Sequence, residues 1–490
     1  MEQAQEVRAY NRSYVATKET YSYVLYDAAQ KFGLDGSLFN TDILKMNLRR
    51  SAFIGFITGI WDVINDPLTA ILVDKTRTRW GKFKIYLVVG AILGLVSGLL
   101  YWNAPLFVNC TDEYDNFKFG FFFIRSLINE TYGTFSGLAI HGFTMSLSPN
   151  PLERTKLLAK ARVWSSFFDF LPGLLSNLFY DLSVNGLIAL PLKKYYMILG
   201  SAYTLIQSLF TLFFFVQGKE RVPQTVETPS VMDGLRAVFR YRPVRLYMLS
   251  ELLGTVGRVK LGYGYYYSYV LGIRSFDTLK DIPTAVYAAV SYAWVDRAKA
   301  KLPSNWLWLI SSDNVDYVIL LINYLFGCIG GRGKNGWYQN PMKMWIVMML
   351  MEFPRKTTWG MRNVIPDEIK YEMIDYCEWQ IGFRSEGMII NAIGLVTKLS
   401  GNLFGSVQNL LLERIGFDLR KDHLGQSDKT KFGIFTLAYL FPFLTGSFSA
   451  IPKLLYKFNK EEKAQMYREL KERREEVAEQ TRQAVAAQAL

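Results

Sequence analysis

Two aspartates and one asparagine stand inside the apolar stretch GIWDVINDPLTAILV, at Asp62, Asn65 and Asp66. Positions i, i+3 and i+4 share one face of an α-helix, so these three side chains converge if the stretch is helical. Oxygen ligands suit a hard cation such as Na⁺, whereas two neighbouring carboxylates can share a proton. The pattern therefore predicts a binding site for Na⁺ or H⁺. The alternative is a structural role in which the carboxylates pair with basic residues of neighbouring helices.

A second apolar stretch, FFFIRSLINETYGTFSGLAIHGFTMSL, places Glu130, Thr134 and His141 along one helical face. The Thr134 hydroxyl is a candidate ligand for the same cation, and its alternative role is an interhelical hydrogen bond. Glu130 and His141 are candidates for substrate contact, because histidine changes its charge near neutral pH and both side chains form hydrogen bonds. For His141 the alternative is a packing role.

Two basic residues adjoin or enter apolar segments. Lys398 lies within the apolar run AIGLVTKLSGNLF, and Arg162 stands directly before the apolar run at 163–182. A cation at such a depth is expected to reach a carboxylate or an anionic ligand. For Lys398 the alternative is a structural pair with Asp62 or Asp66, and Arg162 can instead extend to the membrane surface. A run of tyrosines at 263–269 predicts an aromatic belt at the membrane interface, with stacking on sugar rings as the alternative.

The elements that position these side chains are apolar runs long enough to cross a membrane. Residues 85–102 contain no charge and carry three glycines at four-residue spacing. About twenty such residues span a bilayer, and small residues at this spacing let helices approach closely. Comparable runs occupy 51–73, 119–147, 163–182, 197–216, 246–272, 315–330, 342–351, 387–412 and 432–451, with weaker ones at 20–41 and 285–295. The sequence therefore predicts an all-α membrane protein with twelve transmembrane helices.

Composition agrees with this class and excludes several others. The 490 residues are 50% hydrophobic and 20% charged, which excludes a disordered chain. Three cysteines without paired spacing exclude a disulfide scaffold. The mean hydropathy of +0.09 is low for a membrane protein because several runs carry ionised residues. The first twenty residues are polar, which predicts that the chain does not begin with a cleaved signal peptide. The sequence contains no nucleophile–base pair or metal motif, so we do not expect an enzyme.

The net charge of +13 is concentrated in the connections between the apolar runs. Residues 74–84 hold five basic residues against one acid, and 151–162 and 218–245 are also basic. Lysine and arginine accumulate on the cytoplasmic side of a membrane, so both termini are predicted to be cytoplasmic. We expect a multi-pass protein of the inner (plasma) membrane. The surplus is therefore an orientation signal. No DNA- or RNA-binding motif accompanies it, which argues against a nucleic-acid partner.

An internal repeat divides the chain. The segment VDKTRTR at 73–79 recurs as VDRAKAK at 295–301, and each copy follows an apolar segment. Duplicated halves are common in transporters, and chance similarity between two basic loops is the alternative. The repeat predicts two six-helix bundles at 1–217 and 246–456, a cytoplasmic linker at 218–245, and a charged, solvated helical tail at 457–490.

Two blocks resemble the glycoside–pentoside–hexuronide:cation symporter family of the major facilitator superfamily, to which the melibiose carriers belong. The first is WDVINDPLTAILVDKTRTRWGKFK, and the second is EMIDYCEWQIGFRSEG at 372–387. The resemblance implies the major facilitator fold, with two six-helix bundles around a central cavity. It also implies cation-coupled (Na⁺ or H⁺) symport of a sugar by alternating access, with no cofactor beyond the coupling ion. We expect a monomer that contacts membrane lipids and a small-molecule substrate.

The resemblance also assigns residues. The family's cation site falls on Asp62, Asn65, Asp66 and Thr134, which would hold Na⁺. Its substrate-facing basic residues fall on Arg162 and Lys398, and further substrate-binding candidates are His141, Asp27, Glu130 and Trp359. Charged positions of a cytoplasmic gate between the halves fall on Asp42, Glu372, Asp375, Glu378 and Arg384, with Arg77 and Arg79 as basic partners.

The sugar site departs from the family pattern. The position of a carboxylate that holds sugar hydroxyls is Gly137 here, and the position of a stacking tryptophan is His141. Because Arg162 and Lys398 are kept while the acids are lost, we expect an anionic substrate, a hexuronide or similarly acidic glycoside. The alternatives are symport of an amphipathic or zwitterionic substrate such as a lysophospholipid, and a non-transporting membrane sensor derived from a transporter.

Overall fold

The computed structural model describes residues 14–76, 78–148, 151–221, 240–258, 263–381, 386–421, 424–456, 461–470 and 472. Apart from one isolated bridge between Thr78 and Gly81, the regular structure of these residues is helical. The first group of elements is α2 (Thr17–Ala29), α3 (Gly36–Leu38), η1 (Phe39–Ile43), α4 (Leu48–Lys75), α5 (Lys84–Trp102), α6 (Asn116–Ser146), α7 (Pro151–Val184) and α8 (Leu192–Gln217). The linker predicted at 218–245 lies mostly outside the described residues.

The second group begins with α10 (Arg242–Arg258), α11 (Tyr263–Tyr265), η3 (Tyr266–Leu271), α12 (Phe276–Leu279), α13 (Ala285–Val290) and α14 (Val295–Lys301). It continues with α15 (Ser304–Ile310), α16 (Asn314–Gly327), α17 (Pro341–Thr357), α18 (Trp359–Ile381), α19 (Glu386–Arg414), α20 (Asp428–Gly446) and α21 (Ala450–Leu455). When consecutive short elements are joined, the described chain makes six helical passes from α2 to α8 and six from α10 to α21.

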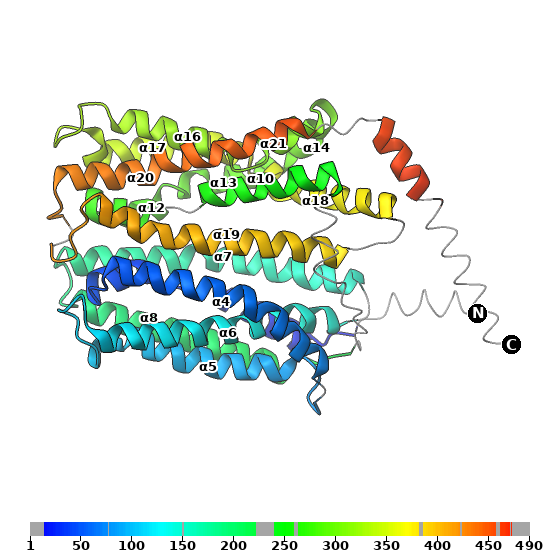
Figure 1. The fold of residues 1–490 in the computed structure, drawn as a ribbon, viewed down its shortest axis with the longest axis horizontal. Coiled ribbons are helices and arrows are strands. Elements are labelled where there is room, and N and C mark those ends of the chain that lie inside the picture. Colours follow the sequence, from blue (N-terminus) through cyan, green and yellow to red (C-terminus); the bar gives the residue numbers. More distant parts are fainter. Residues whose placement is uncertain are drawn as a thin grey trace.

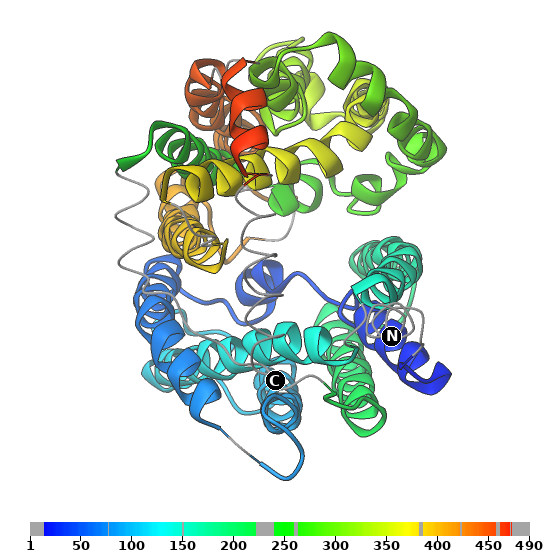
Figure 2. The same cartoon turned by 90° about the vertical axis from the view of Figure 1, so that its right-hand side faces the viewer.

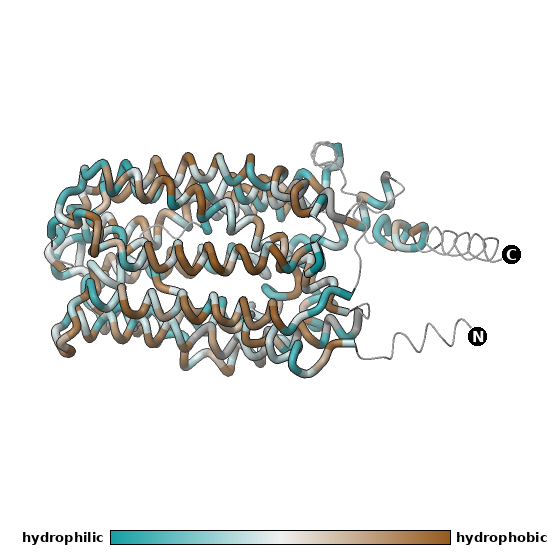
Figure 3. Tube along the Cα trace, turned by 90° about the horizontal axis from the view of Figure 1, so that it is seen from below, coloured by the Kyte–Doolittle hydropathy of each residue, from teal (hydrophilic) through white to brown (hydrophobic). Residues whose placement is uncertain are grey.

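The two groups form two bundles that lie side by side. Figure 2, which looks along the helices, shows α10–α21 on one side and α2–α8 on the other. Along the seam α19 packs against α4, so the groups meet lengthwise (Figure 1). We call the end of the molecule where α2 begins and α21 ends the proximal end, and the opposite end the distal end. Figure 3 shows hydrophobic residues along the helices and hydrophilic residues gathered at both ends.

Glycines set the close packing of α5. A Cβ atom at Gly98 would lie 2.5 Å from Cγ2 of Thr204 on α8, and one at Gly90 would overlap Oγ of Ser136 on α6. The four-residue glycine spacing therefore brings α5 against two neighbours, as the sequence predicted, because a side chain at either position would hold the helices apart.

Three of the described helical segments are both long and apolar enough to cross a membrane on composition alone: α5, α8 and the joined segment Asp428–Leu455. The pair α15 and α16, bent by 44°, passes the same test together. The other passes carry ionised residues, as α4 does at Asp62 and Asp66, or are broken into short helices, as between α12 and α14. This explains why the mean hydropathy is modest for a chain with twelve helical passes.

The tyrosines at 263–269 do not form an interfacial belt, so that prediction is wrong. Tyr265, Tyr266, Tyr267 and Tyr269 are each less than 5% exposed and belong to the largest buried core. The backbone widens into the π-helical η3, and the rings pack in the second bundle and against the first, where hydroxyl partners are available. One example is Tyr266, which donates to the carbonyl of Tyr338 at 2.9 Å.

The described part of the tail is docked rather than solvated, contrary to the prediction. Residues 461–470 form a helix in which Met466 and Leu470 are buried. These two residues are four apart and so share one helical face, which the charged composition of the tail obscured. The helix lies against α18, where Nε1 of Trp379 donates to Oε2 of Glu469 at 2.6 Å.

Candidate functional site

The aspartates of α4 are joined by a lysine from the other bundle. Nζ of Lys398 on α19 lies 2.8 Å from Oδ1 of Asp62 and 2.9 Å from both carboxylate oxygens of Asp66. One ammonium group therefore neutralises two carboxylates at the seam between the bundles. The helical spacing of the aspartates, seen in the sequence, is what lets a single cation reach both.

Asp62 is the more completely enclosed of the two aspartates. It is 2% exposed and accepts hydrogen bonds from Oγ1 of Thr134 on α6 and from Nδ2 of Asn402 on α19, each at 3.3 Å. The side chain of Asp66, by contrast, is 31% exposed. The carboxylate of Asp62 is thus buried, with two neutral hydrogen-bond donors beside it. The carboxylate of Asp66 is partly exposed, and an ion can reach the site from its side.

The remaining predicted residues of this site are close by but differ in their contacts. Asn65 is buried, its Oδ1 accepts from Oγ1 of Thr69 at 3.1 Å, and its Nδ2 has no hydrogen-bond partner. Glu130 on α6 is half-buried, and its electrostatic neighbours are Asp62, Asp66 and Lys398. The donor set suits a hard cation because it consists of carboxylates, an amide and a hydroxyl. No three His, Cys, Asp or Glu side chains of the described residues, at this site or elsewhere, are grouped so that they could hold a metal ion.

Lys398 occupies the space between the carboxylates that a coupling cation would need. Its role as a structural partner of Asp62 and Asp66 is therefore observed directly. An ammonium group and a metal ion cannot share that space, because two like charges at such separation repel each other. The geometry allows an exchange in which one cation replaces the other.

The other predicted substrate residues are scattered. Asp27 on α2 accepts a hydrogen bond from Oγ of Ser165 on α7 at 2.5 Å. Helices α7 and α6 carry Arg162 and His141, whose side chains lie outside the described part of the structure. Trp359 begins α18 and faces a cavity between the bundles. The structure therefore brings together Asp62, Asp66, Thr134 and Lys398 but not Asp27 or Trp359.

The cavity beside Trp359 has a volume of about 800 Å³ and is lined by both bundles. The first bundle contributes residues of α3 and α7, and the second contributes residues from α11 to α19. Its charged lining residues are Arg274, Lys280, Arg355, Lys356, Asp35, Asp277 and Asp281. None of these charged residues was predicted. Arg355 and Lys356 lie at the end of α17, and the other five lie in the short helix α12 and in connections that show no periodic signal.

Polar contacts close the distal end between the bundles. Nη2 of Arg274 lies 3.1 Å from Oδ2 of Asp35, and the backbone N–H groups of Arg274 and Ser275 donate to Asp181 at 2.7 and 2.8 Å. Arg49 on α4 pairs with Glu413 on α19 at 2.7 Å. Each of these contacts joins a residue of the first bundle to one of the second.

The assignment of Asp42 to a cytoplasmic gate shared with Glu372 is wrong. Asp42 lies in η1 at the distal end, where the hydroxyls of Tyr269 and Tyr180 donate to it. The chain runs out along α2 and returns along α4, so the connection that holds Asp42 lies at the opposite end from α18, which carries Glu372. Asp42 does join the bundles, but at the distal end.

Glu372, one of the acidic residues of α18, is paired with the tail and not with a basic loop of the first bundle. Glu372 pairs with Lys463 of the docked tail helix and accepts from Tyr456 at 3.4 Å. Asp375 and Glu378 lie on the same helix. Arg79 is exposed, with its guanidinium 5.0 Å above the ring of Trp80. Arg77 and Arg384 lie outside the described residues. The tail, in a position the sequence did not suggest, supplies the partner of Glu372.

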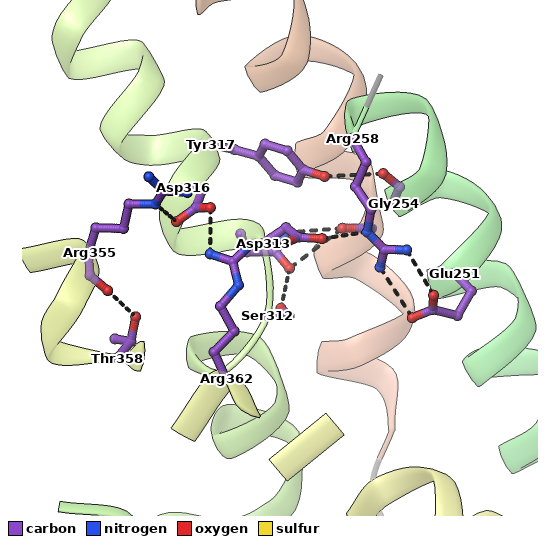
Figure 4. Close-up of polar contacts among 12 residues, drawn as sticks. Glu251, Gly254, Arg258, Ser312, Asp313, Asp316, Tyr317, Arg355, Thr358 and Arg362 are labelled. Carbon is purple, nitrogen blue, oxygen red and sulfur yellow. Dashed lines mark hydrogen bonds and ion pairs between the residues drawn. The ribbon is translucent and has the colours of Figure 1, made fainter. Parts of the chain in front are cut away.

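A second polar network fills the interior of the second bundle (Figure 4). Arg362 on α18 pairs with Asp313 and with Asp316, the latter at 2.5 Å. Arg258 on α10 pairs with Asp313 at 2.5 Å, and Arg355 on α17 contacts Asp316 at 3.3 Å. A cavity of about 340 Å³ adjoins this network and shares Tyr263, Lys280 and Arg355 with the cavity between the bundles. Through Arg355, the network therefore fixes the end of α17, which forms part of the wall of the larger cavity.

Known proteins resemble this chain over most of its length. Residues 15–460 match the family described as MFS/sugar transport protein. The putative sulfoquinovose importer of Salmonella typhimurium (strain LT2) is 23% identical over 459 residues, 89% of this chain and 88% of the relative. Inner membrane symporter YicJ of Escherichia coli (strain K12) is 24% identical over 421 residues, 82% and 84% of the two chains. The crystal structure of a D-xylose-proton symporter matches the fold with a TM-score of 0.57 at 14% identity, covering 90% of this chain and 97% of that one.

Proposed function

Since the chain belongs to the MFS/sugar transport protein family, we propose that it couples the movement of an acidic sugar derivative to that of a cation, Na⁺ or H⁺. The predicted family and the all-α major facilitator fold are confirmed. The protein is accordingly a multi-pass membrane transporter of sugar-like substrates and not an enzyme. The nature of the cation, the charge of the substrate and the orientation in the membrane are our proposals.

The observation that carries the proposal is the contact of Lys398 with Asp62 and Asp66 across the seam. A cation that binds the carboxylates releases Lys398 and breaks an ion pair between the bundles. Movement of α19 relative to α4 then becomes easier, which links cation binding to the conformational change of the transporter. By reciprocity, a conformation that separates Lys398 from the aspartates has a higher affinity for the cation.

We place the proximal end in the cytoplasm, in keeping with the basic connections at that end. The contacts of Arg274, Asp42 and Arg49 at the distal end support a conformation that is closed toward the outside. Alternating access requires these contacts to break and others to form at the proximal end. We expect a monomer in the inner membrane, surrounded by lipid.

An acidic sugar fits both the cavity and the relatives. Four of the seven charged lining residues are basic, so the cavity favours a negatively charged ligand. The name of one relative refers to sulfoquinovose, a sugar with a sulfonate group. A carboxylate or sulfonate on a sugar ring is therefore the substrate class that we propose.

Transport by the purified protein in proteoliposomes tests this function. We expect accumulation of methyl glucuronide or methyl sulfoquinovoside when an inward Na⁺ gradient or pH gradient is imposed separately. Methyl glucoside and a lysophospholipid serve as the neutral and the amphipathic comparison. If an acidic glycoside accumulates to the same level with and without the Na⁺ and pH gradients, cation coupling is refuted. Flux of the neutral glucoside or the lysophospholipid alone would refute the substrate class.

A further inference from the structure

We propose that Lys356 is the residue that recognises the acidic group of the substrate, with Trp359 providing the apolar surface beside it. This inference rests on the proposed function and assigns its substrate specificity to the cavity between the bundles. It separates two tasks: Lys398 serves the cation site on α4, and Lys356 serves the sugar derivative.

The other cations of the cavity are already paired with carboxylates. Arg274 contacts Asp35 at 3.1 Å, and Nζ of Lys280 lies 2.8 Å from Oδ1 of Asp277. Arg355 pairs with Glu352 at 3.0 Å and turns toward the network inside the second bundle. A cation whose charge is compensated by a neighbouring carboxylate attracts an anionic ligand weakly.

Lys356 differs from these cations in its surroundings. Its Nζ lies 4.0 Å from Oδ1 of Asp281, which is beyond hydrogen-bond reach, and no other carboxylate oxygen of the described residues lies within 4.0 Å of it. The side chain is 13% exposed and lines the cavity, and its ammonium group lies 4.5 Å from the ring centre of Trp359. Lys356 is thus an enclosed cation that still needs a strong hydrogen-bond acceptor.

A second observation points to a hydroxylated ligand at the same place. The carboxylate of Asp281 lines the cavity, and its side chain is 36% exposed. A sugar hydroxyl can donate to this carboxylate while a carboxylate or sulfonate on the same ring accepts from Lys356. The indole of Trp359 gives the apolar face of the sugar a surface to contact. The acceptor Asp281, the donor Lys356 and the apolar surface of Trp359 therefore lie on one wall of the cavity, where a small anionic sugar can contact all three.

The test compares Lys356→Gln with Lys343→Gln. Lys343 is on the same helix, and its ammonium group lies 5.0 Å above the ring of Trp337, but it is exposed and outside the cavity. Uptake kinetics are measured with methyl glucuronide and methyl glucoside, which differ at one carbon. We expect Lys356→Gln to raise the KM for the glucuronide about tenfold or more, with less than a threefold change for the glucoside. Lys343→Gln should change neither value more than twofold, and Lys356→Arg should restore most of the preference.

Two results would overturn the assignment of Lys356. One is an unchanged preference for the glucuronide in Lys356→Gln, and the other is an equal loss with both glycosides that Lys356→Arg does not restore. Equilibrium binding to the detergent-solubilised protein separates this inference from the proposed function. Binding of the glucuronide that depends on Lys356, without any transport, would retain the assignment and refute transport. Transport of the glucuronide that does not depend on Lys356 would retain the proposed transport function and refute the assignment of Lys356.

Discussion

Replacement of Lys398 by methionine should increase the affinity of the protein for its coupling cation. In the structure the ammonium group of Lys398 lies between Asp62 and Asp66 and competes with any ion that binds there. Methionine keeps most of the side-chain volume and removes the charge. The variant leaves two carboxylates without their internal partner, so an external cation no longer has to displace it.

The size of the effect follows from the contacts. The hydrogen-bonded pair with the buried Asp62 contributes about 1.5 kcal/mol, the lower end of the range for bonds between charged groups. The pair with Asp66 contributes about 0.5 kcal/mol, because both side chains are about one third exposed and solvent screens them. Their sum, about 2 kcal/mol, corresponds to a roughly thirtyfold lower Kd for the cation.

Tryptophan fluorescence provides an assay, because Trp61 is adjacent to Asp62 and its Nε1 donates to Thr131 at 2.9 Å. Titration of the purified protein with NaCl at constant ionic strength, and separately with acid, measures the affinity for each cation. Lys343→Met is the control and should leave both affinities unchanged. An unchanged or weaker affinity in Lys398→Met, with the protein still folded by circular dichroism, would refute the competition between Lys398 and the cation.

Three further outcomes follow from the structure. Asp66→Asn should abolish gradient-driven accumulation in proteoliposomes while substrate exchange continues; accumulation that still responds to Na⁺ or pH would contradict the site. Arg362→Met should destabilise the second bundle by about 3–5 kcal/mol, because it leaves two aspartates with one cation fewer, and an unchanged Tm in detergent would refute a structural role for the network. Arg274→Ala removes the contact with Asp35 and should raise labelling of Asn177→Cys by an impermeant maleimide about tenfold from the distal side, in a background without native cysteines. Labelling equal to that of the parent would show that this contact does not hold the distal end closed.

The convergence of Asp62 and Asp66 was predictable because it depends on local geometry. Asp62 and Asp66 are four residues apart on one apolar helix, and helical geometry alone brings such side chains together. Lys398 was also recognisable, because a cation deep in an apolar run needs a carboxylate partner. The twelve helical passes were predictable for a similar reason, since the length and composition of each run reflect the thickness of the bilayer.

Other features depended on contacts between segments that are distant in the sequence. The tyrosines near residue 266 became core residues because η3 turns them toward partners in both bundles, such as Tyr338 and Asp42. Asp42 lies at the distal end because of the direction of α2 and α4, and Glu372 pairs with the tail because Met466 and Leu470 dock that helix.

The cavity between the bundles shows the same division most clearly. Its wall brings together Lys356 at the end of α17, Trp359 at the start of α18 and Asp281 from a connection. The sequence by itself determined the helical passes and the convergence of Asp62 and Asp66 on α4, because both depend on spacing within a single segment. Only the tertiary structure decided which cations remain available to a substrate, because that depends on which carboxylates the fold places beside each of them.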